Sequence, residues 1–237
     1  TSLNEYVWEM KDEKVTFKND KGGFGNFTSI HPDQDSLKFK GKTAVYDLKT
    51  NELNIGGVEV IQTCDAYVYT ETGDIEIKKG GVMSTLNNAK IVASTENEYH
   101  VINRATVDVK GKKDYTAKGY YEFNLADRKQ EIYFEDIVGA RVGKGNQSTK
   151  PTETRAKGEI KPEDNFYIDT KTQYQGVITL NANDKNLDFE GFAKLDAPLL
   201  PNREWFTVRN KADKKDLVIS FDKPKNFAGE PLRTGVF

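Results

Sequence analysis

The chain has 237 residues, of which 36% are hydrophobic, 30% charged and 11% aromatic. A disordered chain would lack these aromatic residues and the β-branched runs, so the composition indicates a folded protein with much surface per unit of core. The 35 basic and 37 acidic residues give a net charge of −2, without the basic excess that nucleic acid binding usually needs.

A single cysteine, Cys64, excludes an internal disulfide and indicates a reducing compartment or a fold that needs no bridges. No apolar stretch approaches the roughly 20 residues of a membrane-spanning helix. No signal peptide is visible, and the chain begins Thr1-Ser2-Leu3. We therefore expect a mature form or an excised piece of a longer protein, in which a missing targeting signal means little.

The first segment, residues 1–36, alternates weakly, and we expect it to be irregular apart from one strand at Val15-Thr16-Phe17. From residue 37 to 197, apolar and polar residues alternate with period two, which predicts short half-buried strands. No helical spacing is sustained. The predicted strands include residues 37–39, 44–46, 53–55, 58–60, 75–77, 106–109, 132–134, 177–180 and 187–189.

Two later stretches differ from this pattern. Residues 139–154 are rich in glycine, lysine, serine and threonine, and we interpret them as a loop or a weak boundary within the repetitive domain. Residues 198–237 are punctuated by four prolines and contain predicted strands at 205–208 and 217–221. We expect this C-terminal segment to pack on the same domain.

Glycines recur at regular spacing within the alternating region. Gly41, Gly57 and Gly73 lie sixteen residues apart, and Gly176 and Gly191 fifteen. Glycine weakens a strand unless it allows a bend, a bulge or a close backbone approach. The spacing favours a folded-over β-jellyroll or β-solenoid-like sheet in which strands bend at the same level. Glycines that only mark the turns of an ordinary sandwich are the alternative.

Alanines follow short polar or charged residues at three places, Asp65-Ala66, Asn88-Ala89 and Arg104-Ala105, and an alternating strand follows each. A small inward side chain at a tight corner explains this pattern, because a larger one would overfill a thin core.

The residues that usually carry chemistry form no recognisable site. The two histidines, His31 and His100, are far apart, and one cysteine cannot complete a thiolate–imidazole zinc cluster. No serine lies in a G-x-S-x-G turn, although a triad assembled by geometry stays open. Cys64 is most simply a small buried apolar residue. We therefore assign no catalytic, cofactor-binding or metal-binding residue, expect no cofactor, and predict that the protein is not an enzyme.

Several weaker patterns are interpreted as ordinary loops or chance matches. Asp33-Gln34-Asp35 and Asn183-Asp184-Lys185-Asn186 lack a full calcium loop, and we interpret them as solvated turns. Lys21-Gly22-Gly23-Phe24-Gly25 lacks the spacing of a phosphate-binding loop. Asn26-Phe27-Thr28 and Asn146-Gln147-Ser148 match the glycosylation sequon, which is common by chance.

Aromatic pairs suggest a second class of function. Tyr67 and Tyr69 share one face of a predicted strand, and Tyr121 and Phe123 share a face of another. An outward aromatic row could stack on sugar rings, whereas an inward one would pack a core, and we favour core packing. Paired carboxylates are numerous among the acidic residues, so a glycoside hydrolase stays a lesser alternative.

The runs Asp65-Ala66-Tyr67-Val68-Tyr69-Thr70-Glu71-Thr72-Gly73-Asp74-Ile75-Glu76-Ile77 and Leu86-Asn87-Asn88-Ala89-Lys90-Ile91-Val92-Ala93 resemble the repeats of OstA/LptA-like domains of lipopolysaccharide transport. The similarity covers about residues 37–195, and the chain also looks like a segment of large envelope proteins of Gram-negative bacteria.

This resemblance implies a non-catalytic binding or scaffold module of the periplasm or cell envelope. It implies a groove for acyl chains, and lipid, lipopolysaccharide or neighbouring β repeats as partners. No position matches a diagnostic family residue, so the ligand-binding residues stay unknown. The proline-punctuated C-terminal segment departs from the family pattern. A carbohydrate-binding module is the alternative function.

Overall fold

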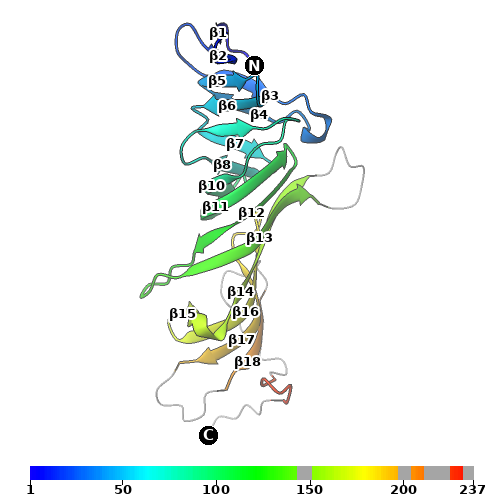
Figure 1. The fold of residues 1–237 in the computed structure, drawn as a ribbon. Helices are drawn as coiled ribbons and strands as arrows, with labels where there is room; N and C mark the ends of the chain where they lie inside the picture. Colours follow the sequence, from blue (N-terminus) through cyan, green and yellow to red (C-terminus); the bar gives the residue numbers. More distant parts are fainter. Residues whose placement is uncertain (143–150, 197–203, 211–224, 232–237) are drawn as a thin grey trace.

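The computed structural model describes residues 1–142, 151–196, 204–210 and 225–231, and it is built almost entirely of β-strands (Figure 1). Strands account for 58% of the structure and helix for 3%, which confirms the predicted all-β class. The strands form two antiparallel sheets. The strands follow one another along the long axis of an elongated molecule, from the N-terminus at one end to the C-terminus at the other (Figure 1).

The smaller sheet has five strands and belongs to the N-terminal part of the chain. Its order is β1-β2-β5-β6-β9. These strands are β1 (Glu5–Glu9), β2 (Lys14–Lys18), β5 (Thr43–Asp47), β6 (Glu52–Gly56) and β9 (Ile75–Ile77).

The larger sheet has thirteen strands and runs the length of the molecule without closing on itself. Its order is β3-β4-β7-β8-β10-β11-β12-β13-β14-β16-β17-β18, with β15 paired to β16. The strands are β3 (Gly25–Thr28), β4 (Lys38–Gly41), β7 (Val60–Thr63), β8 (Ala66–Tyr69), β10 (Leu86–Ala93), β11 (His100–Gly111), β12 (Asp114–Glu122), β13 (Glu131–Arg141), β14 (Thr152–Ile160), β15 (Tyr167–Asp169), β16 (Thr172–Asn181), β17 (Asp188–Leu195) and β18 (Phe206–Asn210). Two single-turn 3-10 helices, η1 (Pro32–Gln34) and η2 (Pro162–Asp164), interrupt the loops.

Glycines occupy the corners at which the chain passes between the two sheets. Gly41 ends β4, Gly57 lies between β6 and β7, and Gly73 lies between β8 and β9. Gly57 and Gly73 have φ angles of +73° and +78°, a backbone region that favours glycine. The Val58 N–H donates to the Gly73 carbonyl at 2.8 Å, so these two corners are hydrogen-bonded to each other. The sixteen-residue spacing therefore marks stacked corners, as predicted.

Gly176 and Gly191 have a different role, because they face each other in the middle of β16 and β17. A Cβ atom on Gly191 would lie 2.2 Å from the Gln175 carbonyl oxygen. Their spacing reflects a close approach of two paired backbones rather than a corner between sheets.

The alanine corners are also confirmed. Ala66, Ala89 and Ala105 are all fully buried. Asn88 and Arg104, which precede two of them, have φ angles of +50° and +49°, and the pairing register shifts at both places. These irregularities bend the long strands β10 and β11, and the small alanine side chain fills the narrow space inside each bend.

Beyond β9 the large sheet has no partner sheet among the described residues and curls so that its inner face covers its own core. The start of β11 meets the turn between β16 and β17, where His100 Nε2 lies 2.6 Å from the Asp184 carbonyl oxygen. The Ser94 hydroxyl donates to Asn183 Oδ1 at 3.3 Å in the same contact. The core here is dense and aromatic, with Phe134, Phe166 and other rings almost fully buried.

The expectation of an irregular segment at residues 1–36 is wrong, because three strands and a 3-10 turn lie there. In β1 every residue after Glu5 is exposed, so no burial alternation marks it, and pairing with β2 holds it. The large sheet also spans the predicted boundary between residues 36 and 37, because β3 on one side of it pairs with β4 on the other.

In the C-terminal segment, β18 pairs with β17, whereas the predicted strand at 217–221 lies outside the described residues. Of the predicted loop at 139–154, residues 139–141 belong to β13 and 152–154 to β14, because they pair with each other in the ladder. Residues 143–150, which include the second sequon, lie outside the described part of the chain.

Candidate ligand-binding pocket

The two histidines lie far apart in different environments. His31 precedes η1 at the protein surface, and its Nδ1 accepts a hydrogen bond from the Asp33 N–H at 3.3 Å. His100 is fully buried between the Asp184 carbonyl and the Tyr121 hydroxyl, and its desolvation lowers the pKa of the imidazole. Both ring nitrogens of His100 therefore have a partner, and the side chain joins β11 and β12 to the turn between β16 and β17 and is unavailable to a substrate.

Cys64 lies in the tight turn between β7 and β8 rather than within a strand. Its φ angle is +51°, and its N–H donates to the Lys112 carbonyl at 2.7 Å. Burial raises the pKa of the thiol to about 12, so it is neutral at physiological pH and a poor nucleophile.

The two weak calcium patterns are structural turns. Asp35 forms an ion pair with Arg141 at 2.5 Å, and this pair joins the η1 loop to the end of β13. In the second pattern, Asp184 and Asn183 receive hydrogen bonds from His100 and Ser94. Among the described residues, no three histidine, cysteine, aspartate or glutamate side chains are grouped to hold a metal ion.

The remaining loop patterns are also structural. Residues 21–25 connect β2 to β3, and the sequon residue Asn26 is exposed on β3.

The aromatic pairs divide between the two faces of the large sheet. Tyr121 and Phe123 pack against the buried core, and Phe123 lies with its ring centroid 5.3 Å from that of Phe166. Tyr67 and Tyr69 point outward, because Ala66 and Val68 of the same strand are the buried residues. The prediction of core packing therefore holds for the first pair and is wrong for the second.

A hollow with a volume of about 640 Å³ lies between the two sheets at the N-terminal end. We call it the inter-sheet pocket. The small sheet contributes Phe17, Ala44, Tyr46, Leu53, Ile55 and Ile77; the large sheet and its loops contribute Phe27, Ile30, His31, Leu37, Phe39, Gly81 and Met83, among others. No lysine, arginine, aspartate or glutamate is among its described lining residues.

One wall of the inter-sheet pocket is an aromatic pair on neighbouring strands. Phe27 of β3 and Phe39 of β4 stack with ring centroids 5.6 Å apart and planes 8° from parallel. The opposite wall carries the aromatic side chains of Phe17 and Tyr46 together with aliphatic side chains such as Leu53 and Ile55. The pocket lies between these two walls.

Gln34 fixes the loops at the rim. Its side chain is almost completely buried; it accepts a hydrogen bond from the Ser29 hydroxyl and donates to the Gly81 carbonyl at 2.6 Å. The rim is therefore formed by two loops, 29–37 and 78–82, joined through one amide. Ile30 at this rim is 99% exposed, an unusual position for an isoleucine.

The sequence analysis assigned no residue to this pocket. Its lining residues Phe39, Leu53, Ile55 and Ile77 sit at ordinary inward positions of alternating strands, so the pattern identifies them only as core. Which inward positions face a filled core and which face open space depends on the separation of two sheets. The sequence carries no local signal for that separation.

No protein-family model matches this chain, and neither do the curated proteins or the solved structures with which it was compared. Within the described residues, no helix has the length and apolar character needed to cross a membrane.

Proposed function

We propose that this domain is a non-catalytic binding module that holds the acyl chain of an amphiphile in the inter-sheet pocket. The observation that carries the proposal is an apolar space of about 640 Å³ between two sheets, with no charged side chain among its described lining residues. Ligand pockets in proteins commonly enclose about 300–1,000 Å³. Burial of each methylene group of an acyl chain contributes about 0.8 kcal/mol, so a chain of ten or more carbons would bind without any polar contact.

The position of the polar groups supports an amphiphile rather than a fully apolar ligand. Ser29, His31 and Gln34 all belong to the rim loop 29–37, whereas the walls are aliphatic and aromatic. A charged head group inside the pocket would lose its hydration without gaining a partner. We therefore place the head group at the rim and the acyl chain between the sheets.

Binding rather than catalysis is proposed because the described lining offers no carboxylate, thiol or lysine side chain. His31 is the one histidine among the described lining residues, and a lone imidazole at the rim has no carboxylate or thiol beside it to act with. The glycoside hydrolase alternative requires two carboxylates facing each other across a cleft, which this pocket lacks among its described residues.

The wider setting of the proposal follows the resemblance to OstA/LptA-like repeats. We propose that the domain works in the envelope of a Gram-negative bacterium, as a carrier or scaffold that contacts lipid, lipopolysaccharide or neighbouring β repeats. The elongated stack of strands, in which β1 is the last strand of the small sheet among the described residues, supports a role alongside other β segments (Figure 1).

Titration of the protein with dodecanoic acid by isothermal calorimetry tests the pocket. Leu53→Trp adds a larger side chain to the wall and should reduce affinity at least about tenfold, a loss of about 1.4 kcal/mol. Leu48→Trp is the matched control, because Leu48 is exposed in the turn between β5 and β6 and does not line the pocket. Absence of binding by the wild-type protein, or equal binding by both variants, would contradict the proposal.

A further inference from the structure

A second hollow lies on the outer face of the large sheet, away from the inter-sheet pocket. It has a volume of about 540 Å³ and is lined by Tyr120, Tyr133, Gln130, Glu131, Glu159 and Asp164, among others. None of its lining residues also lines the inter-sheet pocket. We propose that this hollow, which we call the outer cleft, binds a neutral saccharide.

Two tyrosine rings give the outer cleft an aromatic surface. Tyr120 of β12 and Tyr133 of β13 are cross-strand partners, with ring centroids 4.9 Å apart and planes inclined at 45°. Arg104 lies over the Tyr120 ring at 4.3 Å, so Tyr120 is held from another side. Tyr133 is 40% exposed, and its ring is the surface against which the apolar face of a sugar ring would pack.

Hydrogen-bonding groups surround the tyrosines. Glu131 lies on β13, two residues before Tyr133. Glu159 belongs to β14, and Asp164 belongs to η2. Carboxylates accept hydrogen bonds from the hydroxyl groups that project from the edge of a sugar ring, and amides both accept hydrogen bonds from these groups and donate to them. An aromatic surface with polar groups at its margin is the arrangement by which pockets orient a ligand that has both kinds of surface.

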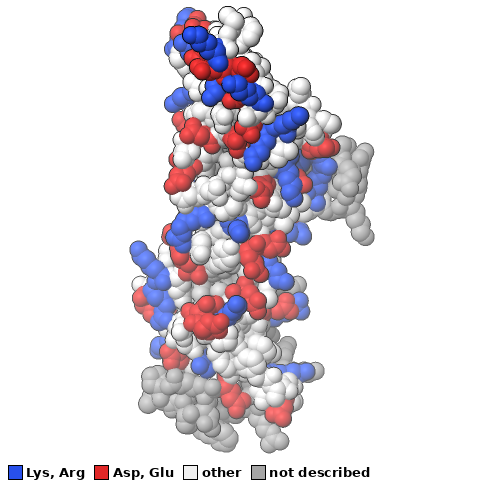
Figure 2. Space-filling view, viewed as in Figure 1, with Lys and Arg blue, Asp and Glu red and all other residues white. Residues whose placement is uncertain are grey.

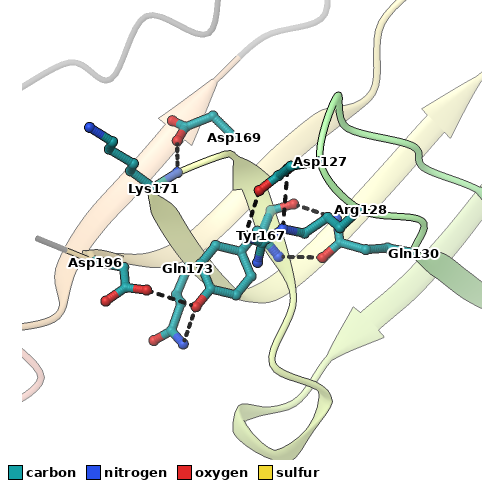
Figure 3. Close-up of polar contacts among 8 residues, drawn as sticks. All are labelled: Asp127, Arg128, Gln130, Tyr167, Asp169, Lys171, Gln173 and Asp196. Carbon is teal, nitrogen blue, oxygen red and sulfur yellow. Dashed lines mark hydrogen bonds and ion pairs between the residues drawn. The ribbon is translucent and has the colours of Figure 1, made fainter.

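The polar wall of the cleft is held in place before any ligand binds. Figure 3 shows Gln130 paired with the backbone of Tyr167, accepting from its N–H at 2.8 Å and donating to its carbonyl at 2.9 Å. Arg128 lies over the Tyr167 ring at 3.8 Å and pairs with Asp127 at 2.9 Å. These contacts join the turn after β12 to β15, so little ordering cost is left for binding.

The Tyr167 hydroxyl extends this support toward the end of β17. It donates to Asp196 at 3.1 Å and accepts from the Gln173 amide at 3.0 Å (Figure 3). Tyr167 is therefore fixed at its backbone, its ring and its hydroxyl. The wall that it supports is a rigid boundary of the cleft.

The charges of the outer cleft favour a neutral ligand. Arg128 is paired with Asp127, and Glu131 is paired with Arg104 at 2.7 Å. Among the described residues, Lys129, Glu159 and Asp164 have no ion-pair partner, so the unpaired groups of the cleft are one cation and two carboxylates. A phosphate or sulfate group would meet Glu159 and Asp164 without a surplus of cations, whereas sugar hydroxyls bind carboxylates without a charge penalty.

The test is a binding assay of the whole chain against a panel of neutral oligosaccharides: fragments of α-glucan, β-glucan, xylan, mannan, galactan and chitin. We expect at least one to bind, with an affinity that Tyr133→Ala reduces about tenfold or more and that Tyr133→Phe retains, because the ring is preserved. Tyr69→Ala is the matched control, since Tyr69 is equally exposed, at 40%, on another strand of the same sheet.

Three results would overturn the proposal: no binding to any member of the panel, equal binding by wild type and Tyr133→Ala, or loss of binding with Tyr69→Ala. Comparison of the near-ultraviolet circular dichroism of each variant with wild type identifies a variant that has not folded, and Tyr133→Leu then replaces Tyr133→Ala. Dodecanoic acid binding is measured on the same variants and should not change, because the two hollows share no lining residue. Failure of the saccharide site therefore leaves the acyl-chain proposal standing, and the reverse also holds.

Discussion

The N-terminal and C-terminal halves of the molecule use the same strand pattern but differ in what lies inside. At the N-terminal end two sheets face each other across the inter-sheet pocket, and Phe39, Leu53 and Ile77 on its walls are only half-buried. At the C-terminal end one curled sheet encloses a filled core. There Phe166 and Phe189 are 3% and 4% exposed, and the ring of Tyr174 lies 5.3 Å from that of Phe189.

The difference lies in how the aromatic rings are arranged. In the C-terminal half, Phe123 contacts both Phe166 and Phe189, so rings from different strands meet across the core. In the N-terminal half, Phe27 and Phe39 stack on each other along one wall. Phe17 and Tyr46 belong to the opposite wall, and the inter-sheet pocket lies between the two walls. Alternation alone thus sets which side chains point inward, while ring placement decides whether the interior is filled or open.

On the face drawn in Figure 2, the described charged residues do not distinguish the two halves. Figure 2 shows lysine and arginine interspersed with aspartate and glutamate along the visible face, with no extended area of one sign. The small net charge of −2 is therefore distributed rather than composed of two opposing patches on that face.

The largest expected difference between the two halves is the loss in free energy of unfolding when an aromatic ring is removed. Phe189→Ala deletes a side chain that contacts Phe123 and Tyr174, and we expect it to lower the free energy of unfolding by about 3–5 kcal/mol. Phe39→Ala removes a half-buried ring next to space that is already open, so we expect about 1–2 kcal/mol. Urea denaturation measures both, and an equal or larger loss for Phe39→Ala would contradict the comparison.

The next largest effect concerns the close backbone approach in the filled half. A Cβ atom on Gly191 would meet the Gln175 carbonyl oxygen at 2.2 Å and the Gly176 Cα at 2.8 Å, and paired strands cannot move apart without losing hydrogen bonds. Gly191→Ala should therefore cost about 1–3 kcal/mol in thermal or urea unfolding.

Ala193→Gly, two residues along the same strand, is the control for Gly191→Ala. It should cost about 1 kcal/mol, because it adds only backbone freedom and removes one methyl group. A neutral Gly191→Ala would show that the two strands are less closely packed than the structure indicates.

The buried histidine gives the C-terminal half a dependence on pH. Desolvation holds the pKa of His100 in the folded protein below its usual 6.5. At pH values between the lowered pKa and 6.5, the unfolded chain therefore binds a proton that the folded chain does not. Stability should therefore fall as pH decreases below about 6.5, with a slope of up to about 1.4 kcal/mol per pH unit.

Urea denaturation of His100→Gln between pH 7.5 and 5 should show this slope reduced relative to wild type. His31→Gln changes a histidine at the pocket rim, outside the contact that His100 makes, and serves as the control. A slope that survives in His100→Gln but disappears in His31→Gln would contradict the assignment.

The smallest effect is expected at the link between the halves. Asp35 of the rim loop pairs with Arg141 at the end of β13, and both side chains are partly exposed. Asp35→Asn should cost less than about 1 kcal/mol in overall stability, as partly exposed pairs usually do. Hydrogen exchange of residues 31–37 should nevertheless accelerate, because the loop loses a fixed partner. Unchanged exchange would show that Gln34 alone holds the rim.

Much of the β architecture could be predicted from local sequence. Alternation at residues 106–109 and 132–134 marks strands β11 and β13, and glycine and alanine mark the corners because few other residues fit there. The hairpin at β1 could not be predicted, because Tyr6, Val7 and Trp8 are all exposed and show no burial period.

The arrangement of the two sheets depends on pairings that local patterns do not encode. β2 pairs with β5, and β6 pairs with β9, in the small sheet. The strands that lie between them in sequence, β3 and β4 and then β7 and β8, belong to the large sheet. For the same reason neither hollow could be predicted. The alternation of side chains along each strand indicates which face of the sheet Tyr133 and Tyr120 occupy. Only the folded structure brings Asp164 and Glu159 beside them.

A crystal structure with 12-bromododecanoic acid would test the central claim most directly. We predict an anomalous bromine signal between the two sheets, close to Ile55 and Phe17, with the carboxylate at the rim near Ser29. A bromine signal confined to the outer surface, or an interior closed by side chains with no ligand between the sheets, would contradict the account.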